Sequence, residues 1–169
     1  MQLTLRHVVR AAALATVIHT HITAQPKDAC ALLKSSEIQA LASSTIGQGE
    51  SAKDELGSLT CVYKWGKGGN AYSGAYQFQV IIADASRMMP GTTGDMMRQG
   101  MAAQVKGEKE GAGMIPGVGE AAMFKSRQIS VETSALAKGR FLMVNFEGPD
   151  ARQKKDQVIA LLKTAVSRL

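Results

Sequence analysis

The amino-acid sequence predicts an α+β domain, in which an antiparallel sheet of about five strands carries three packed helices and one disulfide bond is present. Several short segments alternate apolar and polar residues, which is typical of half-buried strands. Two longer segments repeat apolar residues with the period of an amphipathic helix. The predicted order is helix, two strands, helix, three strands, helix, and short connections between successive strands favour antiparallel pairing.

The first helical segment is predicted from residues that cap helices. Asp28 can cap a short helix that runs through Leu33. Ser36 and Gln39 have the spacing of a capping box, which predicts a further helical turn. Residues 47–57 are polar and are predicted to form a loop.

The next segment predicts a β-hairpin. Its first strand places four apolar residues on one face: Leu59, Cys61, Tyr63 and Trp65. A glycine-rich turn is predicted at residues 66–70, and the alternation resumes over residues 76–82.

The second half of the chain repeats the order of helix and then strands. A helix is predicted from a cap at Thr92 or Thr93 to about Lys106, with one apolar face formed by Met97, Met101 and Val105. Three short strands are predicted at residues 121–125, 128–133 and 140–147. Pro149 is predicted to begin the last helix. The apolar face of that helix contains Val158, Leu161, Leu162, Ala165 and Leu169.

Residues 1–24 are typical of a cleaved secretory signal peptide. Arg6 and Arg10 precede a short apolar run over residues 11–18, and a small residue stands at the predicted cleavage position. The run is shorter than the about 20 apolar residues that a membrane-spanning helix needs, so no stable membrane insertion is predicted. Residues 25–169 are therefore predicted to form a single domain that is periplasmic or secreted.

The two cysteines, Cys30 and Cys61, are predicted to form a structural disulfide bond, because an exported chain with an even number of cysteines usually pairs them. Closing this loop is expected to stabilise the fold by about 3–4 kcal/mol. A redox pair is the alternative, but the sequence contains no Cys-x-x-Cys motif.

The net charge of +6 does not predict nucleic-acid binding. Lysines and arginines are spread along the chain, and the pair Lys154 and Lys155 lies close to Asp150 and Asp156. Such mixed charge is typical of a solvated surface.

Common catalytic templates are absent from the sequence, which contains no Gly-x-Ser-x-Gly, Ser-x-x-Lys or P-loop motif. All three histidines precede residue 25, so the predicted exported domain has no histidine for a triad or a metal site. Asp54, Glu55, Glu108 and Glu110 fall in polar loops, where carboxylates are usually solvated. A hydrolase that combines two carboxylates from distant positions is an alternative.

Three motifs together resemble a family of small exported bacterial α+β domains of unknown function. They are the opening Asp28-Ala29-Cys30-Ala31-Leu32-Leu33, the strand Cys61-Val62-Tyr63, and the turn Pro116-Gly117-Val118-Gly119-Glu120. The resemblance implies an exported domain of the PsbP-like fold type and contributes no catalytic residues. Many of these domains are tethered lipoproteins, and this chain departs from them by lacking the lipid-modified cysteine.

Irregular segments are the predicted binding surface, because loops on a rigid scaffold commonly carry recognition. They are residues 47–57, 66–74 and 106–119. The third segment and the adjacent Glu120 supply the candidate binding residues Lys106, Glu108, Lys109, Glu110, Pro116, Gly117, Gly119 and Glu120. An ordinary glycine turn that leads into a strand is the alternative interpretation of its second half.

Methionine is the one unusual feature of the composition. Seven of the nine methionines fall between Met88 and Met123. Thioethers bind Cu(I), so Met97 and Met101 are candidate copper ligands. The alternative is that these two side chains pack the helix on the sheet.

The sequence therefore favours an exported, non-enzymatic binding or assembly module that needs no cofactor. Its predicted partner is a protein or a component of the cell envelope. An inhibitor or immunity protein that acts against a lytic enzyme is one alternative, and a methionine-based copper-binding protein is another.

Overall fold

The computed structural model describes residues 28–108 and 110–169, so the predicted signal peptide lies outside the described residues. The strands are β1 (Glu50–Lys53), β2 (Leu59–Gly66), β3 (Ala75–Asp84), β4 (Ala112–Met114), β5 (Ala121–Ser126), β6 (Ser130–Ala137) and β7 (Arg140–Glu147). The α-helices are α1 (Ser35–Ile38), α2 (Ala85–Met88), α3 (Gly94–Gly107) and α4 (Lys155–Ser167). Short 3-10 helices include η1 (Ala29–Ala31) and η3 (Ala71–Ser73).

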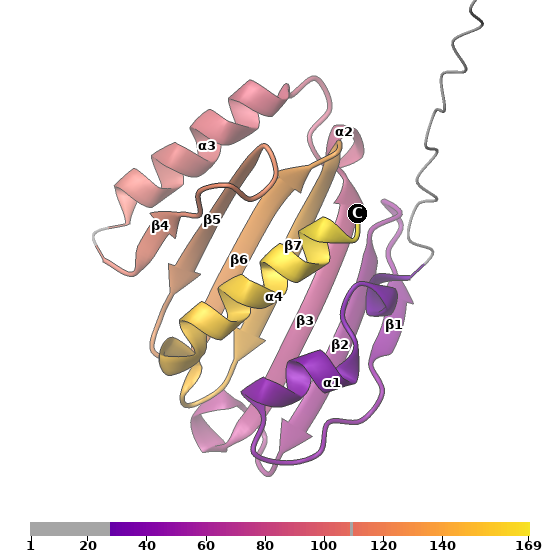
Figure 1. Ribbon diagram of the computed structural model, residues 1–169, viewed down its shortest axis with the longest axis vertical. Coiled ribbons are helices and arrows are strands. Elements are labelled where there is room, and N and C mark those ends of the chain that lie inside the picture. Colours follow the sequence, from indigo (N-terminus) through magenta and orange to yellow (C-terminus); the bar gives the residue numbers. More distant parts are fainter. Residues whose placement is uncertain (1–27, 109) are drawn as a thin grey trace, which may run out of the picture.

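All the strands join one antiparallel sheet in the order β1-β2-β3-β7-β6-β5-β4 (Figure 1). The α+β class and the disulfide bond are confirmed. The prediction of five strands and three helices is wrong, because the described residues form seven strands and four α-helices. The missed strands, β1 and β4, are the two edges of the sheet, and the extra helix is the single turn α2.

Both missed strands lack the pattern that marks a half-buried strand. β1 has the sequence Glu-Ser-Ala-Lys and is exposed at all four positions. β4 is the tripeptide Ala-Gly-Met within the segment that was predicted to be a loop. Edge strands need little burial, so neighbouring strands hold them through backbone hydrogen bonds, without an apolar side-chain pattern.

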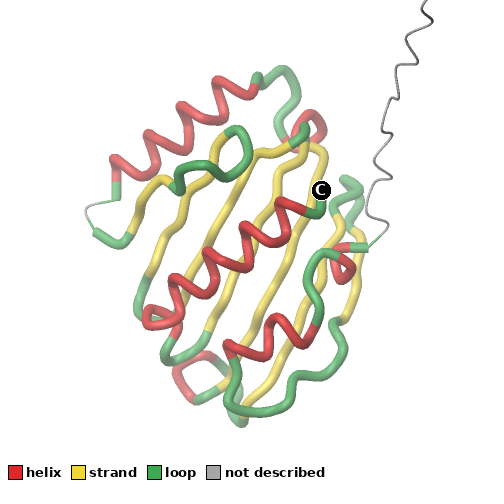
Figure 2. The backbone as a smooth tube through the Cα atoms, viewed as in Figure 1, coloured by secondary structure: helices red, strands yellow, loops and turns green. Residues whose placement is uncertain are grey.

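One face of the sheet, called here the inner face, packs under α4 and the N-terminal segment (Figure 2). In cross-strand register, Val80 lies between Cys61 and Val144, and Phe78 lies between Tyr63 and Phe146. These side chains pack with the apolar stripe of α4 in one core. The core also contains buried Thr133, whose hydroxyl donates to the carbonyl oxygen of Val144 at 2.7 Å.

The N-terminal segment is held to the rest of the fold by covalent and ionic links. The disulfide bond between Cys30 and Cys61 joins η1 to β2. Arg168, next to the end of α4, donates two hydrogen bonds to the Glu37 carboxylate at 2.6 and 2.7 Å. The Arg168 guanidinium, together with the backbone N–H of Lys34, lowers the pKa of Glu37 to about 2.

Two predicted helix starts are shifted in the structure. Glu37, and not the pair Ser36 and Gln39, completes the cap of α1, since its carboxylate accepts from the N–H of Lys34 at 2.8 Å. After Pro149 the chain first forms a 3-10 turn, and α4 begins at Lys155. The first backbone N–H groups of a helix have no acceptor within the helix. Short helical turns satisfy these N–H groups through nearby residues, so the residue that acts as the cap depends on how the turn packs.

The opposite face of the sheet, called here the outer face, is covered differently. Helix α3 begins after Thr93, whose hydroxyl accepts from the N–H of Met96 at 3.3 Å, and it packs against β4 and β5. Outward side chains of β2, β3 and β7 stay partly or fully exposed over most of this face. Within the described residues, no helix combines the length and apolar character that crossing a bilayer requires.

Candidate functional site

The outer face of the sheet presents a row of polar side chains across its central strands. Gln79 of β3 lies between Val62 of β2 and Asn145 of β7, and Asn145 in turn lies beside Glu132 of β6. All four side chains are half-buried, as is usual on an open sheet face. We call the three polar residues of this set, Gln79, Asn145 and Glu132, the polar row.

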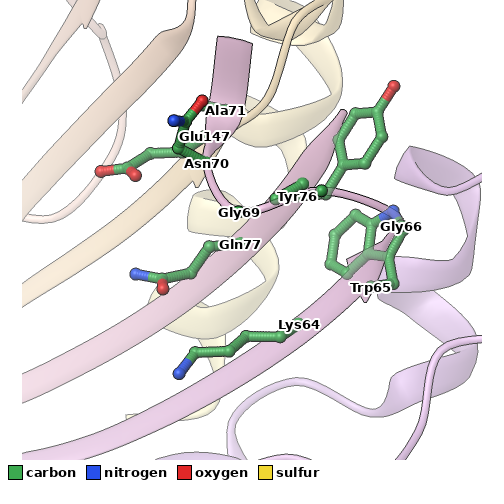
Figure 3. A pocket seen from close by; sticks show the side chains of 11 residues that line it. Lys64, Trp65, Gly66, Gly69, Asn70, Ala71, Tyr76, Gln77 and Glu147 are labelled. Atoms are coloured by element: carbon green, nitrogen blue, oxygen red, sulfur yellow. The ribbon is translucent and has the colours of Figure 1, made fainter. Parts of the chain in front are cut away.

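A pocket lies next to the polar row, at the end of the β2–β3 hairpin. In register, Gln77 lies between Lys64 and Glu147, and these three side chains line a cavity of about 550 Å³ together with Asn70 and the glycine-rich turn. Figure 3 shows the side chains of Lys64, Gln77 and Glu147 on one side of the hairpin. We call this cavity the hairpin pocket.

The wall of the hairpin pocket is a turn that depends on glycine. Gly66 and Gly68 both have positive φ, and a Cβ atom on Gly66 would collide with the carbonyl oxygen of Gly74. The Asn70 side chain caps η3 by accepting from the N–H groups of Tyr72 and Ser73. The turn therefore has a defined shape, and it presents Tyr72 with 76% of its surface exposed.

An aromatic stack supports the pocket from the inner face. The ring of Trp65 lies 5.6 Å from that of Tyr76 and 5.9 Å from that of Phe146, in stacked orientations. Burial is the largest cause that raises the pKa of Tyr76, and the nearby Asp150 carboxylate raises it further. Figure 3 shows Trp65 and Tyr76 on the opposite side of the hairpin from Lys64 and Gln77, so the aromatic stack supports the strands that carry these two polar residues.

A second cavity lies between α3 and the outer face and is bordered mainly by methionines. Its volume is about 160 Å³. The methionines come from α3, from β5 and from the segment before α3: Met89, Met96, Met97, Met101 and Met123. Thr92, Gln104, Ser134 and Phe141 complete most of the remaining wall. We call this space the methionine cavity.

Three of the predicted binding residues lie at or just beyond the C-terminal end of α3. Lys106 lies in the last turn of α3, Glu108 lies 3.5 Å from Lys125 and 3.7 Å from Arg127, and Glu110 is exposed. Lys109 lies outside the described residues.

The other predicted residues belong to the turn between β4 and β5. Pro116 and Gly117 are exposed, and Gly119 has positive φ at a point where an added Cβ atom would collide with the carbonyl oxygen of Leu136. Glu120 lines a pocket at the start of α3. The structure therefore does not gather the predicted residues into a single group.

Sequence patterns identified some of these features and missed others. The helical spacing of Met97 and Met101 correctly placed both side chains on the buried face of α3. Lys64, Gln77 and Glu147 were missed, although the alternation of β2, β3 and β7 assigns all three to the face opposite the core. What the sequence lacked was the strand order, which places β7 beside β3.

The titratable residues show no sign of a conventional metal centre in the described part of the chain, where no group of three His, Cys, Asp or Glu side chains could hold an ion. Comparison with family models, curated proteins and solved structures finds no match for this chain. The resemblance to small exported domains of the PsbP-like type therefore stays a prediction.

Proposed function

We propose that this chain is an exported, non-enzymatic binding or assembly module. In this proposal the polar row and the hairpin pocket together bind a protein or a component of the cell envelope. The observation that carries the proposal is the difference between the two sheet faces. The inner face is packed under helices, whereas the outer face keeps a polar surface that α3 covers mainly at the side of β4 and β5.

The chemistry of this surface suits a partner that is rich in amides or hydroxyls. Gln77 and Gln79 each carry a donor and an acceptor on one rigid strand, and Lys64 and Glu147 add one charge of each sign. Peptide groups and sugar hydroxyls can pair with all of these groups. Polar recognition on a rigid sheet loses little conformational entropy when the partner binds.

Export is part of the same proposal. It rests on the predicted signal peptide and on the disulfide bond between Cys30 and Cys61, which persists in oxidising compartments.

Inhibition of a lytic enzyme is a second candidate, and the exposed ring of Tyr72 favours it. An inhibitor inserts a protruding side chain into a cleft, and Tyr72 projects from a turn of defined shape beside the hairpin pocket. Tyr72→Ala would then abolish inhibition of lysozyme-type enzymes in a cell-wall clearing assay. The same variant would leave envelope binding through the polar row unchanged.

Site-specific photocrosslinking in cells tests the leading proposal. A photoreactive residue at Gln79 or Lys64 should give a discrete adduct with an envelope component, because both positions lie on the proposed surface. The matched control positions are Gln157 and Lys163, which are exposed on α4 at the other face.

The adduct should also respond to substitutions beside the crosslinker. Gln77→Ala with Glu147→Ala should reduce adduct formation at Gln79 without changing the melting temperature. Equal crosslinking from the α4 positions would refute the proposed surface. Hydrolysis of a cell-wall substrate that is lost on changing one carboxylate would refute the non-enzymatic proposal.

A further inference from the structure

We propose that the methionine cavity is a Cu(I) site, in which Met97, Met101 and Met123 supply the inner thioether ligands. Met89 and Met96 lie at its opening. This inference does not depend on the proposed binding surface, because the cavity lies at the other end of the outer face, under α3.

The first argument is that five methionines from separate elements line one space. Met97 and Met101 lie one helical turn apart on the buried face of α3. Met123 reaches the same cavity from β5, and its side chain is buried beside that of Met101. Packing of α3 alone requires large apolar side chains, and leucine would serve that purpose.

The second argument is the space that the methionines leave open. A space of about 160 Å³ stays free among these side chains, and the exposed Met89 and Met96 lie at its solvent side. Methionine has three rotatable side-chain bonds, so the sulfur atoms can move into this space toward a bound ion.

The third argument is the charge of the cavity wall. The residues that line the cavity are all uncharged, so the wall offers thioether, hydroxyl and amide groups to an ion. Soft, monovalent Cu(I) suits thioether ligands and carries a smaller desolvation cost than a divalent ion. Zn²⁺ and Mg²⁺ prefer thiolate, imidazole or carboxylate ligands, so the site should discriminate against both.

The fourth argument is access from solvent. Met97 and Met101 are each 6% exposed, whereas Met89 is 37% exposed and Met96 is 56% exposed. An ion can therefore meet the outer thioethers first and pass to the buried ones. This gradient of exposure provides an entry path, which a metal site requires.

The test is an anaerobic titration with Cu(I) itself, in competition with a chromophoric Cu(I) chelator. It uses the exported protein purified without a histidine tag. The expected result is one Cu(I) per chain with a Kd below about 1 µM. Copper X-ray absorption should show sulfur ligands, and a coordination shell of nitrogen ligands would overturn the proposal.

Methionine-to-leucine variants locate the site, since this exchange nearly conserves volume and usually preserves the fold. Loss of even an outer-shell partner weakens metal sites about 10- to 100-fold, so Met97→Leu with Met101→Leu should weaken Cu(I) binding at least about 100-fold. The controls Met88→Leu and Met114→Leu lie outside the cavity and should keep full affinity.

Two further measurements keep the test decisive if the double variant folds poorly. Met96→Leu changes an exposed side chain and should still reduce affinity measurably. Ag(I), a redox-stable substitute for Cu(I), should shift the methyl resonances of the five cavity methionines and leave those of Met88 and Met114 in place. Equal shifts at all methionines, or equal losses in the control variants, would refute the site.

Discussion

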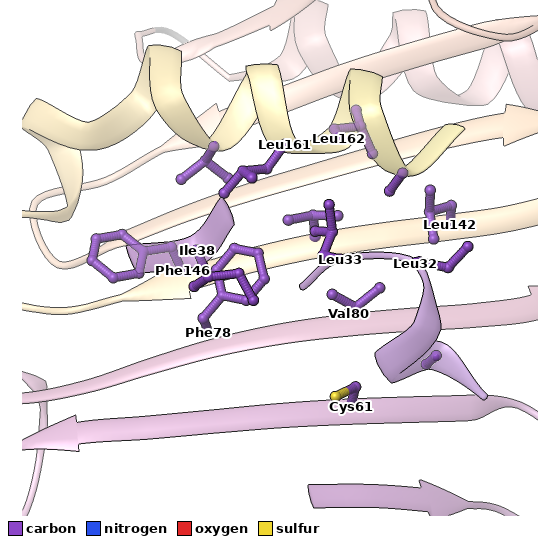
Figure 4. Close-up of a cluster of buried hydrophobic side chains, with 14 of the residues drawn as sticks. Leu32, Leu33, Ile38, Cys61, Phe78, Val80, Leu142, Phe146, Leu161 and Leu162 are labelled. Carbon is purple, nitrogen blue, oxygen red and sulfur yellow. The ribbon is translucent and has the colours of Figure 1, made fainter. Parts of the chain in front are cut away.

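Helices α3 and α4 are nearly equal in length, yet they contact the sheet in different ways. Helix α4 lies over the inner face and buries Leu161 and Leu162 in the main core, with Phe146 and Leu142 of β7 opposite (Figure 4). Helix α3 buries chiefly Met97, Met101 and part of Val105 in two small clusters on the outer face. Helix α4 therefore completes the main core, whereas α3 packs more loosely and lies over a cavity.

Glycine content increases the difference between the two helices. Gly94, Gly100 and Gly107 lie within α3, whereas α4 contains none. Glycine inside a helix costs about 0.5–1 kcal/mol relative to alanine. Local opening is therefore expected to be easier at α3 than at α4, which hydrogen exchange would measure.

The largest expected effect is on the α4 side, where the disulfide bond holds the N-terminal segment. Replacing Cys30 and Cys61 together by serine should lower the free energy of unfolding by about 3–4 kcal/mol, because the unfolded chain regains the entropy of the open loop. Chemical denaturation of both proteins measures this loss. A loss below about 1 kcal/mol would mean that packing alone holds the segment in place.

A cavity in the main core should have an effect of similar size. Leu162 is fully buried, so Leu162→Ala should destabilise the fold by about 2–5 kcal/mol. The matched control, Ala160→Ser, changes an exposed position of the same helix and should stay within about 0.5 kcal/mol of the wild type. If Met101→Ala on α3 costs as much as Leu162→Ala, the proposed contrast between the helices is wrong.

The ion pair between Glu37 and Arg168 should make a pH-dependent contribution to the free energy of unfolding. The pKa of Glu37 is about 2 in the fold, below its ordinary value of 4.5. Its stabilising effect is therefore present above pH 4.5 and is lost as the pH falls toward 2. Because both side chains are partly exposed, the contribution should be about 1 kcal/mol.

Glu37→Gln measures this contribution, because glutamine keeps the shape but does not ionise. The difference in unfolding free energy between the wild type and this variant should shrink as the pH is lowered from neutral. Asp156→Asn, on an almost fully exposed side chain, is the control and should show no such trend. A pH-independent difference for Glu37→Gln would show that hydrogen-bond geometry, and not charge, links α4 to α1.

The smallest expected effect is a gain in stability on α3. Gly100 is helical and has open space where a Cβ atom would lie, so Gly100→Ala should stabilise the fold by about 0.5–1 kcal/mol. Gly117 also has open space, but its φ of +71° disfavours alanine, so Gly117→Ala should destabilise instead. Thermal melts of the two variants measure these effects. A lower melting temperature for Gly100→Ala would contradict the interpretation that α3 is less stable than its packing on the sheet allows.

The elements that the sequence predicted well are those with a buried face. Strong alternation identified β2, β3 and β7 with nearly correct bounds, because each strand packs large apolar residues on the core. Strand β6 was predicted to begin two residues early and to end too soon, because its last residues are buried on both faces. Burial of Leu136 and Ala137 on opposite faces removes the alternation there.

The candidate sites depend on contacts between distant segments, so the sequence predicted them only in part. The spacing of Met97 and Met101 assigned both to one helix face, but nothing local places Met123 beneath them. In the hairpin pocket, Glu147 joins Lys64 only because β7 pairs with β3. Strand order is set by packing over the whole sheet, and local patterns do not encode it.

The exposed edge strand β1 bears on how the protein behaves at high concentration. An open sheet edge can pair with another chain and begin aggregation. Here the edge is four residues long, carries Glu50 and Lys53 at its ends, and is tied to η1 by the hydrogen bond from Ser51 to Asp28 at 2.8 Å. A second copy adding its own strand would have to remove water from both charges. The short, charged edge therefore opposes intermolecular sheet growth in a protein that leaves much of one sheet face open.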